Sequence, residues 1–180
     1  MSFSGRNISY LILVSLISLV TCRQEEKKHL SREELNEQKE LVDRANKYLV
    51  RQDRELIESY AARRGWNIRV TETGLFYDIY QQGEGALAET GKYALIEYEL
   101  SLLDGTPCYS SGESGPKKIL IGPSREETGL IQGILMLREG ARARFILPPH
   151  IAHGLLGDEN RIPPRSIIVY EVGLLKISDE

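Results

Sequence analysis

An alternating segment at residues 93–103 places the strongest constraint on the fold. Apolar side chains at every second position define one face of an extended strand, and glutamates lie on the other. The apolar face consists of Ala94, Ile96, Tyr98 and Leu100. Asp104-Gly105 follows directly, and this dipeptide is a strong hairpin signal. The segment therefore predicts a half-buried strand that turns into an antiparallel neighbour.

The chain around this hairpin predicts further strands and one short helix. Additional strands are expected at residues 75–80, 107–111, 117–121, 141–147 and 166–177. A helix is expected at residues 129–137, ended by Gly140. Five or so antiparallel strands with one helix indicate an α+β fold, in which a half-barrel sheet wraps on that helix.

A helical lead-in is predicted at residues 31–73, before the strand-rich part. Ser31 and Glu34 have capping-box spacing, Asp53 resembles a second N-cap, and Gly65 suits a position just past a helix end. These signals predict two helices, at about 31–50 and 54–64. They would form a spacer or dimerisation arm, or pack on their own domain. The apolar stripe is too short for a strong coiled-coil argument, which favours the packed arrangement.

The first 30 residues resemble an export signal and a tether. Residues 1–21 place Arg6 before an apolar run at 8–20, which is shorter than a spanning helix. Cys22 follows this run directly, as in a lipobox, although Thr21 stands where a smaller residue is usual. We expect lipidation of Cys22 and a tether at 22–30; a non-lipidated secretory signal or an uncleaved anchor are the alternatives.

Charge and cysteine content exclude two classes of protein. The net charge is −3, with no basic stripe of the kind that nucleic-acid binding needs. The two cysteines, Cys22 and Cys108, each have an explanation other than pairing, so a disulfide framework is not expected.

Residues 74–180 carry motifs that resemble the FKBP-type peptidyl-prolyl cis-trans isomerases. The matching motifs are Gly83-x-Gly85, Tyr98, Leu103-Asp-Gly105, Ser110-Ser111, Gly129-Leu130-Ile-Gln-Gly133, Leu137-x-x-Gly140, Ala141-Arg-Ala143-Arg144, Pro149-His-Ile-Ala152-His153-Gly154, Gly157, Ile162-Pro163-Pro164 and Val169-Tyr170-Glu171-Val172. The lipobox, the helical lead-in, Tyr109-Ser-Ser, and Gly157-Asp-Glu-Asn with Ile162-Pro-Pro look closest to the gliding-motility-associated FKBP-like lipoproteins of the Bacteroidetes.

The resemblance implies a set of pocket residues. Tyr98, Tyr109, His153 and Tyr170 fall at catalytic positions, whereas Cys108, Leu130 and Ile162 fall at substrate-binding positions. Tyr98, Ile162 and Tyr170 match the family pattern as aromatic or apolar walls. Neither a metal nor another cofactor is implied, because the family rotates X–Pro bonds without covalent chemistry.

Other pocket positions depart from the family. Leu130 stands where Trp is common, Cys108 replaces Phe, Tyr109 replaces Asp, and His153 replaces the Tyr that anchors a substrate carbonyl. Glu126 and Glu127 fall near the segment that usually offers apolar contact and a backbone N–H, so this stretch is expected to be locally rearranged.

Two functions therefore stay open. One is a prolyl isomerase that assists folding of exported envelope proteins, with proline-containing polypeptides as clients, a membrane contact through lipid and no nucleic acid. The other is a weak or inactive FKBP-fold chaperone or scaffold for an envelope complex, such as a gliding-motility complex. The oligomeric state is unknown. His150 and His153 as metal ligands, or Cys108 with His153 as a thiol nucleophile, are poorer alternatives, because further ligands or an orienting residue are not evident.

Overall fold

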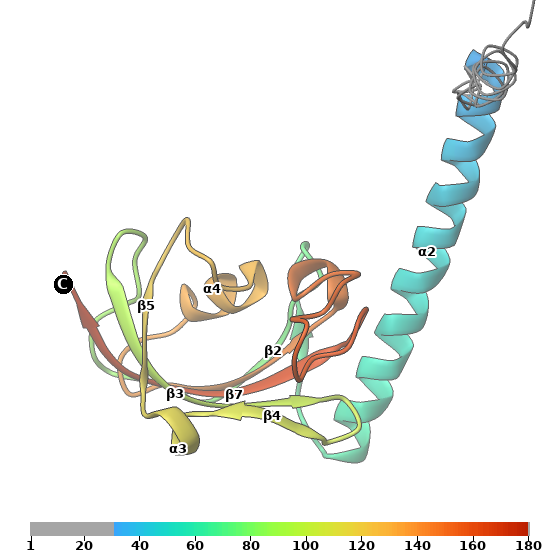
Figure 1. The fold of residues 1–180 in the computed structure, drawn as a ribbon. Helices are drawn as coiled ribbons and strands as arrows, with labels where there is room; N and C mark the ends of the chain where they lie inside the picture. The colour runs from blue at the N-terminus through green and yellow to red at the C-terminus, as the bar shows by residue number, and fades with distance from the viewer. Residues whose placement is uncertain (1–30, 180) are drawn as a thin grey trace, which may run out of the picture. The chain divides into compact units, whose positions relative to one another are not determined.

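The computed structural model describes residues 31–179 (Figure 1). The predicted signal peptide, the tether and Cys22 lie outside the described residues. The chain divides into two compact units, residues 1–42 and 43–180, so the division falls within one helix. Described residues of the first unit are helical from Arg32 and exposed. No helix of the described part is long and apolar enough to cross a membrane.

A single helix, α2 (Arg32–Arg63), replaces the two predicted helices. It begins with the predicted capping box, because Ser31 Oγ accepts from the Glu34 N–H and Glu34 Oε2 accepts from the Ser31 N–H. The predicted break at Asp53 is wrong. The Asp53 carboxylate does not cap a helix but is buried against Arg165, a partner 112 residues away. Because the Asp53 carboxylate binds this distant arginine, it does not serve as the N-cap of a second helix.

The domain after α2 is a seven-stranded antiparallel sheet. Its strands are β1 (Arg69–Val70), β2 (Phe76–Gln81), β3 (Tyr93–Leu102), β4 (Pro107–Ser110), β5 (Lys117–Leu120), β6 (Arg142–Leu147) and β7 (Ile168–Ser178). The order is β1-β2-β6-β7-β3-β4, with β5 also paired to β3. The strand predictions are confirmed to within two residues at their ends; the two-residue β1 was not predicted.

Three short helices complete the fold, α3 (Ser111–Ser114), α4 (Thr128–Ile134) and the 3₁₀ turn η1 (Pro149–Ile151). Helix α4 lies on the concave side of the curved sheet (Figure 1), as predicted for the 129–137 segment. Its two glycines allow close approach to β6. A Cβ at Gly129 would lie 2.7 Å from the Leu147 side chain, and one at Gly133 would lie 2.7 Å from the Phe145 ring.

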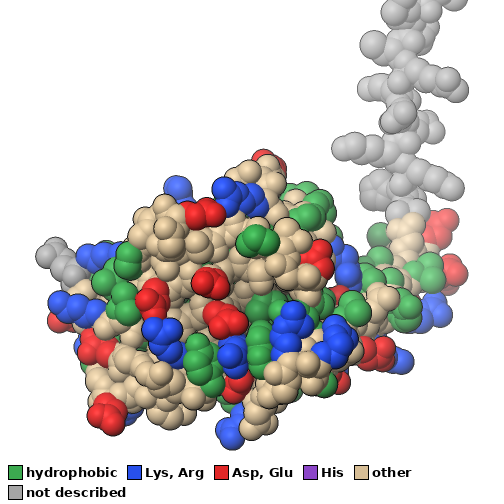
Figure 2. All heavy atoms as spheres, turned by 90° about the horizontal axis from the view of Figure 1, so that it is seen from below, with side chains coloured by type: hydrophobic (Ala, Val, Ile, Leu, Met, Phe, Trp, Pro, Cys, Tyr) green, Lys and Arg blue, Asp and Glu red, His purple; other side chains and the backbone are tan. Residues whose placement is uncertain are grey.

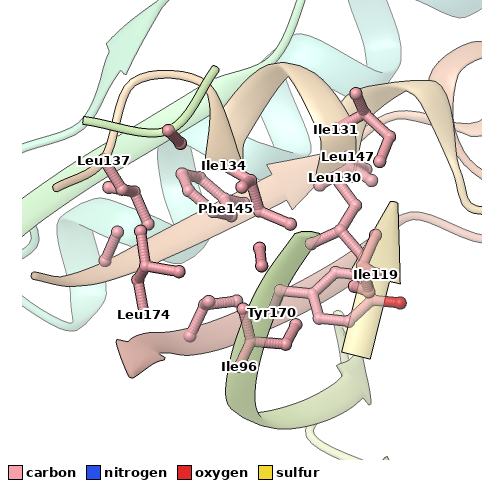
Figure 3. Close-up of a cluster of buried hydrophobic side chains, with 14 of the residues drawn as sticks. Ile96, Ile119, Leu130, Ile131, Ile134, Leu137, Phe145, Leu147, Tyr170 and Leu174 are labelled. Atoms are coloured by element: carbon pink, nitrogen blue, oxygen red, sulfur yellow. The ribbon is translucent and has the colours of Figure 1, made fainter. Parts of the chain in front are cut away.

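The main core fills the space between α4 and the sheet. Leu130 and Ile134 of α4 meet Ile96, Phe145 and Leu174 of the strands there (Figure 3). All of these side chains are almost fully removed from water. Their burial, at roughly 25 cal/mol per Å² of apolar surface, holds the sheet in its curved shape around the helix.

The last turns of α2 cover part of the opposite face of the sheet. Ile57 and Tyr60 form a second cluster with Phe76, Ile146 and Val169. This packing confirms that the helix docks on its own domain from about Asp53 onward. Tyr48, by contrast, stays exposed.

The uncovered part of this outer face is charged. Glu97 of β3 pairs with Arg142 of β6 across Gly173 of the intervening strand β7. Arg144 lies between Asp78 and Glu171. Figure 2 shows this side of the molecule, where acidic and basic side chains lie next to one another. The two signs alternate, so the face carries no extended field of one charge.

Candidate functional site

A cleft of about 290 Å³ opens beside the concave core. Its lining residues are Tyr98, Leu100, Tyr109, Lys117, Arg125, Glu126, Glu127, His153 and Tyr170. The cleft thus brings together all four side chains that were predicted as catalytic. They come from β3, β4, the loop after η1 and β7.

Strand pairing sets the two aromatic walls. Strand β3 pairs with β7 so that Leu100 lies opposite Tyr170, and Tyr98 lies opposite Val172. Side chains at every second strand position share a face, so Tyr98 and Tyr170 point to the same side of the sheet. Their ring centroids are 6.0 Å apart, with the planes inclined by 50°. Tyr170 is buried, whereas Tyr98 is partly exposed to the cleft.

A carboxylate lies among these rings. Glu127, the residue just before α4, has a side chain that is only 9% exposed. The Tyr170 hydroxyl donates to Glu127 Oε1 at 3.2 Å, and His153 Nε2 lies 2.6 Å from the same oxygen. Burial first, and then the charge of Glu127, hold the pKa of Tyr170 well above its ordinary value. Tyr170 therefore remains a hydrogen-bond donor throughout the neutral range.

Tyr109 organises the loop that borders the cleft. Its hydroxyl donates to Asp158 Oδ2, and Asp158 Oδ1 accepts from the N–H groups of Asn160 and Ile162, at 3.0 and 2.7 Å. Burial alone would raise the pKa of Asp158, but these hydrogen bonds, with that of Tyr109 foremost, hold it below its ordinary value. The pKa of Tyr109 is raised, first by its bond to Asp158 and then by burial.

The three predicted substrate-binding residues lie in the core and not in the lining of the cleft. Cys108, Leu130 and Ile162 all belong to the main core and are at most 2% exposed. Leu130 points toward the ring of Tyr170 (Figure 3). They belong to the same core cluster as Tyr170, and a direct contact of these residues with substrate stays a prediction.

The poorer sequence-based alternatives find no support in the contacts. His150 Nε2 lies 3.0 Å from the Thr73 carbonyl oxygen, whereas His153 faces Glu127. The Cys108 thiol lies 3.8 and 3.7 Å from the carbonyl oxygens of Thr106 and Arg161, so no base is positioned to take its proton. Burial also raises the pKa of Cys108, which disfavours the thiolate.

Sequence reasoning missed two polar groups of the site. Glu127 was noted only as a departure from an apolar segment, and Asp158 only as part of the Gly157-Asp-Glu-Asn motif, without a role in the site. The signal for Glu127 was available in the sequence, because a charged residue at the edge of an apolar pocket needs a partner. For Asp158, the Asp-x-Asn spacing of a loop with local side-chain-to-backbone bonds was the usable signal.

Comparisons with known proteins agree with this geometry. A family model described as FKBP-type peptidyl-prolyl cis-trans isomerase matches residues 85–175. The chain is 31% identical over 121 residues to a probable FKBP-type peptidyl-prolyl cis-trans isomerase FkpA of Neisseria meningitidis. It is 26% identical over 124 residues to FkpA of Escherichia coli. These matches cover 67% and 69% of this chain, and 43% and 44% of those relatives.

Solved structures show the same fold. The crystal structure of AtFKBP13 aligns with a TM-score of 0.60 at 25% identity, over 62% of this chain and 99% of that one. The crystal structure of FkpA from Escherichia coli aligns with a TM-score of 0.62 at 18% identity, over 99% of this chain and 84% of that one. With the family model spanning half of the sequence and the sheet wrapped on α4, the chain belongs to the FKBP-type peptidyl-prolyl cis-trans isomerase family.

Proposed function

We propose that the domain catalyses cis–trans isomerisation of X–Pro bonds. The observation that carries this proposal is the pair of inclined rings of Tyr98 and Tyr170, which line a cleft next to the apolar core. A proline ring is apolar and compact, and such a surface suits it. The cleft holds no arrangement suited to covalent catalysis among the described residues, and this reaction needs none.

The barrier to rotation is about 18–20 kcal/mol, because amide resonance is lost in the twisted state. A site accelerates rotation if it binds the twisted amide better than either planar form. Aromatic walls remove water from the amide, and the twisted amide loses less solvation than the planar one. Tyr98, His153 and Glu127 line the cleft, and we expect their polar groups to fix the neighbouring peptide groups.

The cellular setting is a second part of the proposal. The signal-like residues 1–21 and the lipobox-like Cys22 support export and lipid anchoring at the cell envelope, at the periplasmic face or the outer membrane. Clients would then be proline-containing envelope proteins. The Tyr109-Ser-Ser motif and the helical lead-in support a place among the gliding-motility-associated lipoproteins.

One observation favours a second function, a non-catalytic chaperone or scaffold. The Glu127 side chain, bonded to Tyr170 and close to His153, lies where a purely apolar pocket would leave room for a proline ring. A domain whose cleft is partly filled in this way would bind clients without accelerating rotation. Only a measurement of activity separates the two functions.

The test is an isomerisation assay with the purified full chain in detergent. Both a series of prolyl peptides and a refolding protein limited by proline isomerisation serve as substrates, since uncatalysed rotation takes tens to hundreds of seconds. We expect acceleration that falls roughly tenfold or more in Tyr98→Ala and in Tyr170→Ala, a loss of about 1.4 kcal/mol of transition-state stabilisation per factor of ten.

Tyr48→Ala is the matched control, because Tyr48 is exposed on α2 and outside the cleft. It should retain the full rate. Circular dichroism confirms that each variant is folded. If the folded wild-type chain accelerates neither substrate, the isomerase proposal is overturned and the scaffold function replaces it.

A further inference from the structure

His153 and Glu127 meet through buried atoms beside the cleft. His153 Nε2 lies 2.6 Å from Glu127 Oε1, and nothing else in the described part of the chain bonds to Nε2. An unprotonated ring nitrogen and a carboxylate oxygen are both acceptors, and two acceptors repel each other at this distance. A proton therefore lies between them. Imidazole is a stronger base than a carboxylate, so this proton belongs to Nε2.

The proton on Nε2 fixes the state of the other ring nitrogen of His153. A neutral imidazole carries one N–H, and the hydrogen bond at one nitrogen decides which of the two has it. Nδ1 is then an acceptor. The His153 side chain lines the cleft and is 26% exposed, and Nδ1, unlike Nε2, is not buried. Nδ1 has no hydrogen-bond partner among the residues that the structure describes, so it is available to a ligand.

The donors that line the cleft are engaged elsewhere. The Tyr109 hydroxyl donates to Asp158, and the Tyr170 hydroxyl donates to Glu127. The charged groups of the lining are Lys117, Arg125, Glu126 and Glu127. Within the described lining, neither cation bonds to His153. The acceptor at Nδ1 is therefore left for a donor that a ligand brings.

We propose that Glu127 is a positioning residue, which holds His153 in the Nε2–H form so that Nδ1 accepts a backbone N–H of the client beside the proline. The family resemblance implies the opposite polarity, because the Tyr that His153 replaces anchors a substrate carbonyl. A neutral His153 whose only N–H points at Glu127 has no donor for a carbonyl. This inference rests on the proposed function in that it places a prolyl segment in the same cleft.

A requirement for an N–H defines a substrate class. Proline itself has no N–H, so the nearest donors are those of the residue before it and the residue after it. On the side that His153 contacts, the neighbour must then be a residue other than proline. The cleft therefore selects isolated prolines and disfavours runs of prolines.

The first experiment locates the ring proton of His153. The full chain in detergent, with isotope-labelled histidine, is brought to a pH at which each imidazole carries one proton. Long-range nitrogen–proton NMR correlations then distinguish the two tautomers, and His153→Phe assigns the signal. We expect the proton on Nε2 in the wild type and in Glu127→Gln, whose amide oxygen still accepts from the same N–H.

Glu127→Leu removes the acceptor, so the proton should then be shared between both ring nitrogens of His153. Glu126→Leu is the matched control, because Glu126 lines the same cleft but pairs with Lys117, and it should keep the wild-type tautomer. A proton on Nδ1 in the wild type, or an unchanged tautomer in folded Glu127→Leu, would overturn the inference.

The second experiment asks whether Nδ1 accepts a client N–H. Three peptides share the sequence Ala-Leu-Pro-Phe, one with amides throughout and two in which an ester replaces the N–H of the leucine or of the phenylalanine. Binding to the wild-type full chain is followed by NMR shift changes. We expect one ester to bind about three- to tenfold more weakly than the amide, the range of a single net hydrogen bond.

His153→Phe keeps a ring of similar shape but has no acceptor, so the loss on ester substitution should fall to about twofold or less. This comparison also removes any effect of the ester on the peptide itself. Equal affinity of the wild-type chain for all three peptides, no binding of any of them, or a loss that survives in folded His153→Phe would each overturn the inference.

Rates of isomerisation on the same peptides separate this inference from the isomerase proposal. Ester-sensitive binding without faster rotation sustains the inference and removes the isomerase activity. Faster rotation of all three peptides at equal affinity does the opposite. If a variant at Glu127 or His153 does not fold, the tautomer and the ester comparison in the wild-type chain still decide.

Discussion

Arg165 Nη2 donates to both carboxylate oxygens of Asp53, each at 3.1 Å, and thereby joins helix α2 to the loop before β7. Asp53 is 5% exposed, so its charge depends on this partner. Breaking such a buried pair lowers the free energy of unfolding by roughly 3–5 kcal/mol. Because Arg165 is partly exposed, we expect Arg165→Ala to lower it by about 2–3 kcal/mol. Urea unfolding measures this loss.

Arg165 also has a positive φ of 57°, which allows a sharper test. Glycine tolerates this backbone conformation and alanine does not, so Arg165→Gly should be about 1 kcal/mol less destabilising than Arg165→Ala. A double-mutant cycle with Asp53→Ala isolates the ion pair. Additive losses in the cycle would show that the pair does not couple the helix to the domain.

Gly133 is one of the two glycines at which α4 closely approaches β6. A Cβ there would lie 2.7–2.8 Å from three atoms of the Phe145 ring. Gly133→Ala should therefore destabilise the domain by about 1–3 kcal/mol, although alanine favours the helix. Thermal unfolding measures the effect. Gly112→Ala in α3 is the control, since its nearest contact, Ser110 Oγ at 3.4 Å, is ordinary, and an equal loss there would contradict the packing argument.

Asp158 makes stability depend on pH in a defined direction. Its folded-state pKa is lowered, so its contribution is present above the unfolded value of about 3.9 and is lost as pH falls through the folded value. We expect Asp158→Asn to lower Tm by about 2–4 °C between pH 5 and 8. The variant and the wild type should converge only as pH falls below about 3.9 and through the lowered folded-state pKa of Asp158.

Asp43→Asn serves as the control for this titration, because Asp43 lies exposed on α2. Its difference from the wild type should stay near zero at every pH. A Tm difference for Asp158→Asn that persists unchanged in acid would mean that the hydrogen bonds of Asp158, and not its charge, stabilise the loop.

The Cys108 thiol should resist alkylation. Cys108 is 1% exposed, so the reagent has little access to its sulfur. Burial also raises the pKa of the thiol, which lowers the fraction of reactive thiolate. Iodoacetamide should modify Cys108 more than about a hundredfold more slowly in the folded chain than in denaturant. Mass spectrometry of the peptide that contains Cys108 follows the reaction separately from Cys22. Fast modification under native conditions would place the thiol in the cleft.

Local sequence patterns predicted most strands of the domain, because alternating apolar residues and turn glycines set these strands and their ends. The alternation of Ala94, Ile96 and Leu100 sets one buried face of β3, and Gly105 has the positive φ that its turn requires. The prediction of two helices in the lead-in was wrong because a long-range contact, and not a local rule, sets the role of Asp53. Asp53 has the residue type of a helix cap, but its role is set by Arg165, which no local pattern connects to it.

The cleft was predictable in part. The family resemblance put Tyr98 and Tyr170 in one pocket, and the ring centroids of the two residues lie 6.0 Å apart in the structure. The role of Glu127 depends on three segments that meet only after folding: the turn before α4, strand β7 and the loop that holds His153. A residue whose neighbours come from such distant positions cannot be assigned from spacing alone.

The position of β7 has a consequence for biogenesis. The last strand of the chain pairs with β6 on one side and β3 on the other, so it lies in the middle of the sheet. A chain still emerging from a ribosome can form the β2–β6 and β3–β4 pairs, but not the connection between them. The core closes only when residue 178 is free, so the nascent domain remains open, and dependent on protection from aggregation, until the whole of β7 has emerged.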